Sequence, residues 1–203
     1  MVNYALDVSS AEPVPATRLQ TAARSTAERR ILDAALGLFS QHGVSGTSLQ
    51  MIADAVGVAK AAIYYRFKTK DEIIIAVTAS QLAKLEDALE HAEAAKNRTQ
   101  ARNLLLERVI DMAVEQRQTV RILQFDPVIV RFLGEHQPFQ QFMGRLYGAL
   151  LGDDAGRKSR LRIVMLSGAI GSAVMHPLVA DIDDETLKAE LLGVARQLFD
   201  IPD

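Results

Sequence analysis

The sequence of 203 residues contains no cysteine. Disulfides, thiolate nucleophiles and cysteine-ligated metal sites are therefore excluded, and a reducing cytoplasm is the natural setting. The first twenty residues contain two prolines, Asp7, Glu12 and no apolar run of signal-peptide length. We expect residues 1–24 to form a flexible arm rather than a secretory signal.

Catalytic and metal-binding motifs are also missing. The four histidines are far apart in the sequence, and there is no H-E-x-x-H, G-x-S-x-G, P-loop or post-strand G-x-G-x-x-G motif. They are His42, His91, His136 and His176. The sequence therefore predicts no catalytic residue, no metal site and no cofactor.

The two-residue alternation typical of strands is absent, as are Asn-Gly and Asp-Gly hairpin turns. Ser25 and Glu28 have the spacing of a capping box, and the apolar residues after them predict a helix ending near Gly43. Thr47 and Gln50 offer a second capping box, and Gly57 a C-terminal cap. Longer helices are predicted at about 71–94, 100–117, 118–133, 138–151, 157–177 and 184–199. The fold class is therefore all-α.

Charge and helix length divide the chain. Residues 1–70 hold 8 Lys/Arg against 5 Asp/Glu, whereas residues 71–203 hold 15 against 20. A basic first part and an acidic second part suggest that only the first part contacts a polyanion. We expect a small helical module over residues 25–70 and a larger helical bundle over residues 71–203.

The stretch GVAKAAIYYRFKTK, residues 57–70, concentrates four cations and three aromatic residues. On a helical wheel Ile63 and Phe67 share an inward stripe, whereas Ala61, Ala62 and Tyr65 lie opposite. Small side chains let a helix approach a surface closely, and cations and tyrosine hydroxyls suit phosphate oxygens. This pattern predicts a helix-turn-helix whose second helix enters the DNA major groove.

Four segments, RILDAALGLFSQHG, TSLQMIADAVGV, IYYRF and KTKDEI, together resemble the N-terminal domain of TetR/AcrR-family transcriptional regulators over about residues 26–75. The resemblance implies nine or so helices, a homodimer built on the last two long helices, and repression relieved when a small molecule enters the bundle. The DNA contacts that it implies are Thr47, Ser48, Gln50, Lys60, Ala61, Ala62, Tyr64, Tyr65 and Lys70. Ala59 departs from the family, which usually has a serine or similar cap there.

Two further assignments near this module stay open. Tyr64 can be a boundary aromatic that packs under its helix, a phosphate contact, or both. Arg18 and Arg24 can reach a DNA minor groove, as basic arms do, or belong to a disordered arm.

Residues 163–180 contain no Asp, Glu, Lys or Arg over 18 positions. Length alone admits a membrane span, but glycines, serines, His176 and Pro177 favour a helix buried on nearly all sides. We expect a dimer interface, with an internal core or a membrane as the alternatives. Its predicted residues are Gly168, Ser172, Met175, Leu187, Leu191, Val194 and Leu198.

The middle helices are rich in methionine and aromatic residues, which are typical of an apolar ligand pocket as well as of ordinary core. The predicted lining is Met112, Phe125, Phe132, Phe142, Met143, Tyr147 and Met165. The chain is thus predicted to be a cytoplasmic homodimeric regulator that binds a palindromic double-stranded operator and an apolar effector. A helical protein-interaction module and a small helical enzyme are the alternatives.

Overall fold

The computed structural model describes residues 18–19, 24–151 and 156–199. In these ranges the chain forms ten α-helices, one 3-10 turn and no strand, which confirms the all-α class. The helices are α1 Thr26–Gly46, α2 Leu49–Val56, α3 Lys60–Arg66, α4 Lys70–Ala94, α5 Arg98–Glu115, α6 Arg117–Phe125, α7 Pro127–Glu135, α8 Gln137–Leu151, α9 Arg157–Ala173 and α10 Asp184–Phe199, and the 3-10 turn is η1 Pro177–Val179.

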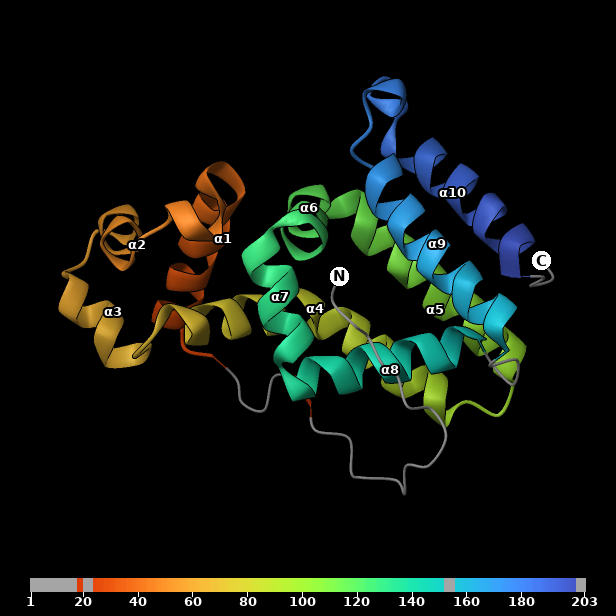
Figure 1. The fold of residues 1–203 in the computed structure, drawn as a ribbon, viewed down its shortest axis with the longest axis horizontal. Helices are drawn as coiled ribbons and strands as arrows, with labels where there is room; N and C mark the ends of the chain where they lie inside the picture. The colour runs from red at the N-terminus through yellow and green to blue at the C-terminus, as the bar shows by residue number, and fades with distance from the viewer. Residues whose placement is uncertain (1–17, 20–23, 152–155, 200–203) are drawn as a thin grey trace.

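The helices form an elongated molecule in which α2 and α3 lie at one end and α9 and α10 at the other (Figure 1). Helix α4 connects the two ends, because it packs against α1 near its start and against α5 and α8 further along. One continuous apolar core extends from Ile31 in α1 to Ala195 in α10. A movement of α4 would therefore displace its neighbours in the helix-turn-helix module and in the bundle. No helix within the described ranges combines the length and apolarity needed to cross a bilayer.

Local sequence signals explain the boundaries of the first helices. Ser25 and Glu28 form the predicted capping box of α1, and Gly57 ends α2 in the left-handed conformation with φ 77°. The second predicted box is wrong. Ser48, not Thr47, caps α2, since its hydroxyl accepts the Met51 N–H at 3.1 Å.

The single helix predicted at 118–133 is also wrong, because the chain breaks into α6 and α7 at Asp126. Pro127 lacks an N–H and disfavours the helical conformation in the residue before it. Asp126 accordingly has ψ 116°, ends α6 and caps α7. In the same way α9 ends at Ala173, earlier than the predicted residue 177.

Candidate nucleic-acid interface

Helix α3 divides its side chains as the wheel predicted. Ile63 and Phe67 are buried in the core, whereas Tyr65 is 79% exposed and Tyr64 42% exposed. Ala61 and Ala62 are exposed as well. The outward face therefore combines two methyl groups with two phenol rings, and the small alanine side chains let the helix approach another surface closely.

Two cations flank this face and lie over its rings. The Lys60 ammonium is 5.6 Å from the Tyr64 ring centroid, and the Lys68 ammonium is 5.8 Å from that of Tyr65. Such cation–π contacts at exposed sites are weak, of the order of 0.5–1 kcal/mol. Both ammonium groups can consequently exchange a ring for a phosphate oxygen at little cost.

The residues at the start of α2 differ in what they can contact. The prediction that the Thr47 side chain touches DNA is corrected, since Thr47 is buried and its hydroxyl donates to the Gly43 carbonyl at 2.8 Å. Ser48 and Gln50 are exposed. The Gln50 amide donates to the Asp54 carboxylate at 2.8 Å, which uses one of its two N–H groups.

Lys70 has a structural role that the sequence reasoning missed. Its ammonium donates to the carbonyl oxygens of Val44 at 2.9 Å and Thr47 at 3.2 Å, at the end of α1. An ammonium has three N–H donors, so one remains for a phosphate oxygen. The sequence around Lys70 does not indicate this contact, because the two carbonyl groups belong to another segment of the chain.

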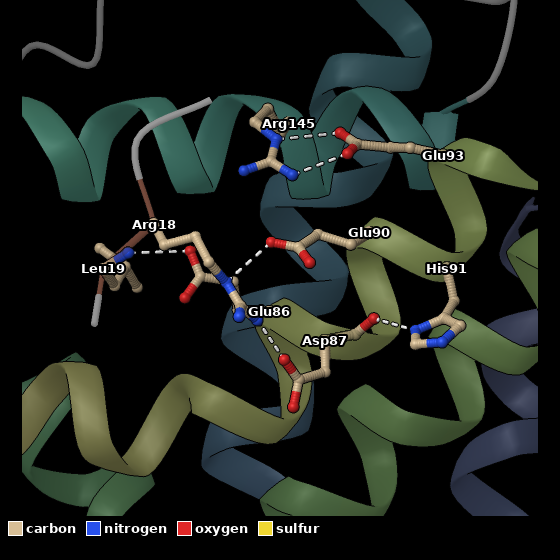
Figure 2. Close-up of polar contacts among 8 residues, drawn as sticks. All are labelled: Arg18, Leu19, Glu86, Asp87, Glu90, His91, Glu93 and Arg145. Carbon is tan, nitrogen blue, oxygen red and sulfur yellow. Dashed lines mark hydrogen bonds and ion pairs between the residues drawn. The ribbon is translucent and has the colours of Figure 1, made fainter. Parts of the chain in front are cut away.

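Arg18 lies against the bundle in this structure rather than beside α3 (Figure 2). Its guanidinium pairs with Asp87 and, at 2.9 Å, with Glu90, while the Leu19 N–H donates to the buried Glu86 at 2.9 Å. The hydrogen bond to Asp87 and the nearby carboxylates raise the pKa of Arg18. The minor-groove role of Arg18 is therefore not supported by its placement here.

Arg24 lies beside α3 but packs inward. Its guanidinium carbon is 5.9 Å from the centroid of the buried Phe67 ring. Residues 1–17 and 20–23, the rest of the predicted arm, are outside the described residues.

Comparison with known proteins agrees with this geometry. The model of the bacterial regulatory proteins of the tetR family matches residues 31–77, which include α2, α3 and the start of α4. Over 61 residues the chain is 49% identical to the HTH-type transcriptional regulator AcrR of Shigella flexneri. The helix-turn-helix module of this chain, residues 25–70, which we call the reading module, is that of a TetR/AcrR-family regulator. That match spans 29% of this chain and 28% of the relative, so it concerns the reading module alone.

The TetR-like fold extends over nearly the whole chain. A TetR-like transcriptional regulator from Rhodococcus sp. RHA1 aligns with 87% of this chain and 98% of its own, with a TM-score of 0.65 and 23% identity. The transcriptional regulator FadR from Bacillus subtilis, solved in complex with stearoyl-CoA, aligns with 86% of this chain and 99% of its own, with a TM-score of 0.63 and 18% identity. At these identities the likeness concerns the fold.

The outer face of α9 is an exposed apolar stripe. Leu161, Val164 and Met165 are 60–63% exposed, and Gly168 and Ser172 continue the same face. Figure 1 shows α9 and α10 side by side at this end. Contiguous apolar surface of this kind marks an interaction site on soluble proteins.

The residues predicted for an interface on α10 divide between two environments. Val194 and Leu198 are 53% and 40% exposed, and Met175, after α9, is 39% exposed. The prediction for Leu187 is corrected, because it is 3% exposed and belongs to the core of its own protomer. Leu191 is half-buried and packs against that core. Helix α10 packs against α5, and Leu187 near the start of α10 is buried there.

The predicted pocket lining is corrected at two positions. Phe125 is 52% exposed at the end of α6, and Met165 is 63% exposed on the outer stripe of α9. Phe142 is buried, and four others are partly buried against the core: Met112, Phe132, Met143 and Tyr147.

A groove of about 510 Å³ lies elsewhere, between the end of α4 and α5, and none of the seven predicted residues lines it. Its floor includes Ala92 and Leu105, and its rim includes His91 and Lys96. No cluster of three or more His, Asp or Glu residues within the described ranges could hold a metal ion.

Proposed function

We propose that this chain is a DNA-binding transcriptional repressor that reads an operator with the outward face of α3. The observation that carries the proposal is that Tyr65, Ala61 and Ala62 are exposed on the second helix of a helix-turn-helix whose sequence matches the tetR-family model. The methyl groups suit thymine methyls in the major groove. Tyr64, Lys60, Ser48 and the free N–H of Lys70 provide phosphate contacts that fix the register.

The proposed assembly is a homodimer through the stripe on α9 and the exposed end of α10. The exposed Leu161, Val164 and Met165 support it, because monomers rarely leave so large an apolar patch in water. A two-fold axis presents two copies of α3 and therefore requires a palindromic operator. Its half-sites should be separated by at least one helical turn of DNA, about 34–36 Å. Such a regulator acts in the cytoplasm, where the chromosome is.

The proposed effector is an apolar or amphipathic small molecule that enters the bundle and lowers operator affinity. Support comes from Phe132, Met143 and Tyr147, which lie only partly buried around the core, and from the acyl-CoA named for the Bacillus subtilis relative. A coupling free energy of about 1–3 kcal/mol would weaken operator binding about 5- to 150-fold. Reciprocity requires that the operator weaken effector binding by the same factor.

Operator binding is tested with a duplex that the wild-type chain selects from a random-sequence pool. Ala61→Glu adds a carboxylate to the proposed contact face and should abolish preference for this duplex over a scrambled one. Ala94→Glu is the matched control, since it adds the same charge to an exposed alanine at the far end of α4. Equal binding by both variants would refute the role of α3.

Effector coupling is tested by measuring ligand affinity for the dimer with and without saturating duplex. Stearoyl-CoA is the first probe, followed by shorter acyl chains and other apolar compounds. Lower affinity in the presence of the duplex is expected for an inducer. If every ligand found in the bundle binds the free and DNA-bound dimer equally, the chain is a constitutive DNA binder.

The alternatives predict different results. A protein-interaction module would show no duplex preference at any salt concentration. The names of the relatives that match by sequence describe transcriptional regulators, and this argues against an enzyme.

A further inference from the structure

The end of α1 contains a backbone kink at Gly43. Its φ of 69° and ψ of 167° fall in a region that essentially only glycine occupies. Helical hydrogen bonding is interrupted there, and the following turn, Val44–Gly46, is held by other groups. Val44 itself is fully buried, so its N–H and C=O both need partners inside the protein.

Asp126 provides the partner for the N–H. One carboxylate oxygen, Oδ1, accepts the N–H groups of Val128 at 2.9 Å and Ile129 at 3.2 Å, which caps α7. The other oxygen, Oδ2, accepts the Val44 N–H at 2.9 Å. A single side chain thus joins the corner between α6 and α7 to a segment 82 residues earlier in the chain.

Lys70 provides the partner for the carbonyl group of Val44. Its ammonium donates to the Val44 carbonyl at 2.9 Å, and Lys70 is the first residue of α4. Val44 is therefore fixed from the bundle corner by Asp126 and from the connecting helix by Lys70. The space is close, because a methyl group at Gly43 would lie 3.4 Å from Asp126 Oδ2.

This junction lies inside the reading module, directly before α2. Four residues after Val44, Ser48 caps α2, and α2 packs on α3. A displacement at Val44 therefore moves the start of α2 and, with it, the face of α3 that the proposed function places on DNA.

We propose that Asp126 is a positioning residue for operator recognition: its hydrogen bond to Val44 fixes the reading module relative to the α6–α7 corner. The inference rests on the proposed function. It adds a connection from the bundle to α1, separate from the covalent connection through α4. A bundle ligand that shifts the α6–α7 corner would act on α3 through this side chain.

Asp126→Asn tests the cross-module bond without removing the helix cap. Asparagine caps helices as well as aspartate does, so its amide oxygen keeps the α7 bonds, but the NH₂ group then facing Val44 cannot accept a hydrogen bond. Asp126→Ser is a second test variant, since serine also caps helices but is too short to span both partners. Asp183→Asn is the matched control, because the Asp183 carboxylate accepts the Thr186 N–H and hydroxyl at the start of its own helix and forms a local cap.

The readouts are amide hydrogen exchange at Val44 and affinity for the selected and scrambled duplexes. Both Asp126 variants should exchange Val44 faster and bind the selected duplex about 10-fold more weakly, within the range known for coupling residues. Affinity for the scrambled duplex should change little, whereas the unfolding midpoint should fall in both variants, because the buried Val44 N–H loses its acceptor. Asp183→Asn should alter neither Val44 exchange nor duplex affinity.

The two ideas fail in different ways. If wild-type chain prefers no duplex, the proposed function is wrong and the inference fails with it. If wild-type chain prefers a duplex but both Asp126 variants bind it equally well, Asp126 only stabilises the fold and the inference alone is wrong. Unchanged exchange at Val44 in both variants would also overturn it.

Discussion

Arg145 and Glu93 form a bidentate ion pair: Arg145 Nε lies 3.0 Å from Glu93 Oε1, and Arg145 Nη2 lies 2.7 Å from Glu93 Oε2. The pair joins α8 to the last part of α4 (Figure 2). The hydrogen bond to Glu93 raises the pKa of Arg145, whose side chain is only 19% exposed. Lysine offers a point charge and cannot reproduce this parallel geometry.

We therefore expect Arg145→Lys to lower the free energy of unfolding by about 1 kcal/mol, at the upper end of the range for exposed pairs. Urea denaturation measures it. Arg108→Lys is the control, since Arg108 contacts Asp111 at 3.9 Å on one exposed helix face, and it should change stability by only a few tenths of a kcal/mol. Equal losses in the two variants would contradict a special role for the bidentate pair.

Ala59→Ser should stabilise the chain. Ala59 caps α3 with an extended backbone but has no side-chain acceptor for the free N–H groups of the first turn. A serine hydroxyl at a helix N-cap is worth about 1 kcal/mol over alanine. Urea denaturation should show this gain, whereas Ala95→Ser, placed after the end of α4, should show none. A loss of stability in Ala59→Ser would mean that the hydroxyl is not oriented toward the helix.

Lys60→Gln should reduce the salt dependence of duplex binding. If the Lys60 ammonium replaces one condensed counterion, the slope of log affinity against log salt should decrease by about one. Binding to all duplexes should weaken alike, because phosphates carry no sequence. Lys96→Gln removes an exposed lysine that follows the last residue of α4, far from α3, and should leave the slope unchanged. Identical slopes for wild type and Lys60→Gln would place Lys60 away from DNA.

Gly168→Leu should weaken the dimer without harming the protomer. A Cβ atom at Gly168 would meet no other residue's atoms within 4 Å in the protomer, and the same is true of Gly148 on α8. Both glycines are exposed within helices, so either leucine should improve helix propensity slightly. Only Gly168 lies on the apolar stripe of α9. Sedimentation should therefore show dissociation for Gly168→Leu and none for Gly148→Leu, and duplex affinity should fall only for the former.

His136 should make stability depend on pH. Its Nδ1 atom is buried without a hydrogen-bond partner among the described residues, its ring stacks on Phe132, and burial lowers its pKa. The unfolded chain, with a histidine pKa of about 6.5, then binds more protons than the folded chain below that pH. The free energy of unfolding should accordingly be highest above about pH 6.5 and decrease as the pH falls through the folded pKa.

The measurement is urea denaturation between about pH 7 and 5, a window that contains the reference histidine value. His136→Gln should flatten the pH dependence, whereas His42→Gln, which removes an exposed histidine, should not. A His136→Gln profile parallel to that of the wild type would assign the dependence to other groups.

Local signals in the sequence were enough to predict the reading module. The capping box of Ser25 and Glu28, the left-handed Gly57 and the inward stripe of Ile63 and Phe67 depend on residues within one or two turns of each other, and all three were predicted correctly. The break at Pro127 was visible as a helix-breaking residue, but a continuous apolar pattern concealed its effect. Thr47 and Ser48 are adjacent and chemically alike, so only the kink at Gly43 decided which of them caps α2.

The role of each apolar face was decided by tertiary structure. Within one apolar run, Ile163 and Leu166 are buried while Val164 and Met165 are exposed, although all four side chains are apolar. The sequence by itself determined that these residues form a helix with apolar side chains nearly all round. Which face is core depends on where neighbouring helices pack, and the reach of Asp126 to Val44 depends on two segments meeting across 82 residues. Periodicity contains no information on such meetings, because it records only neighbours along one helix.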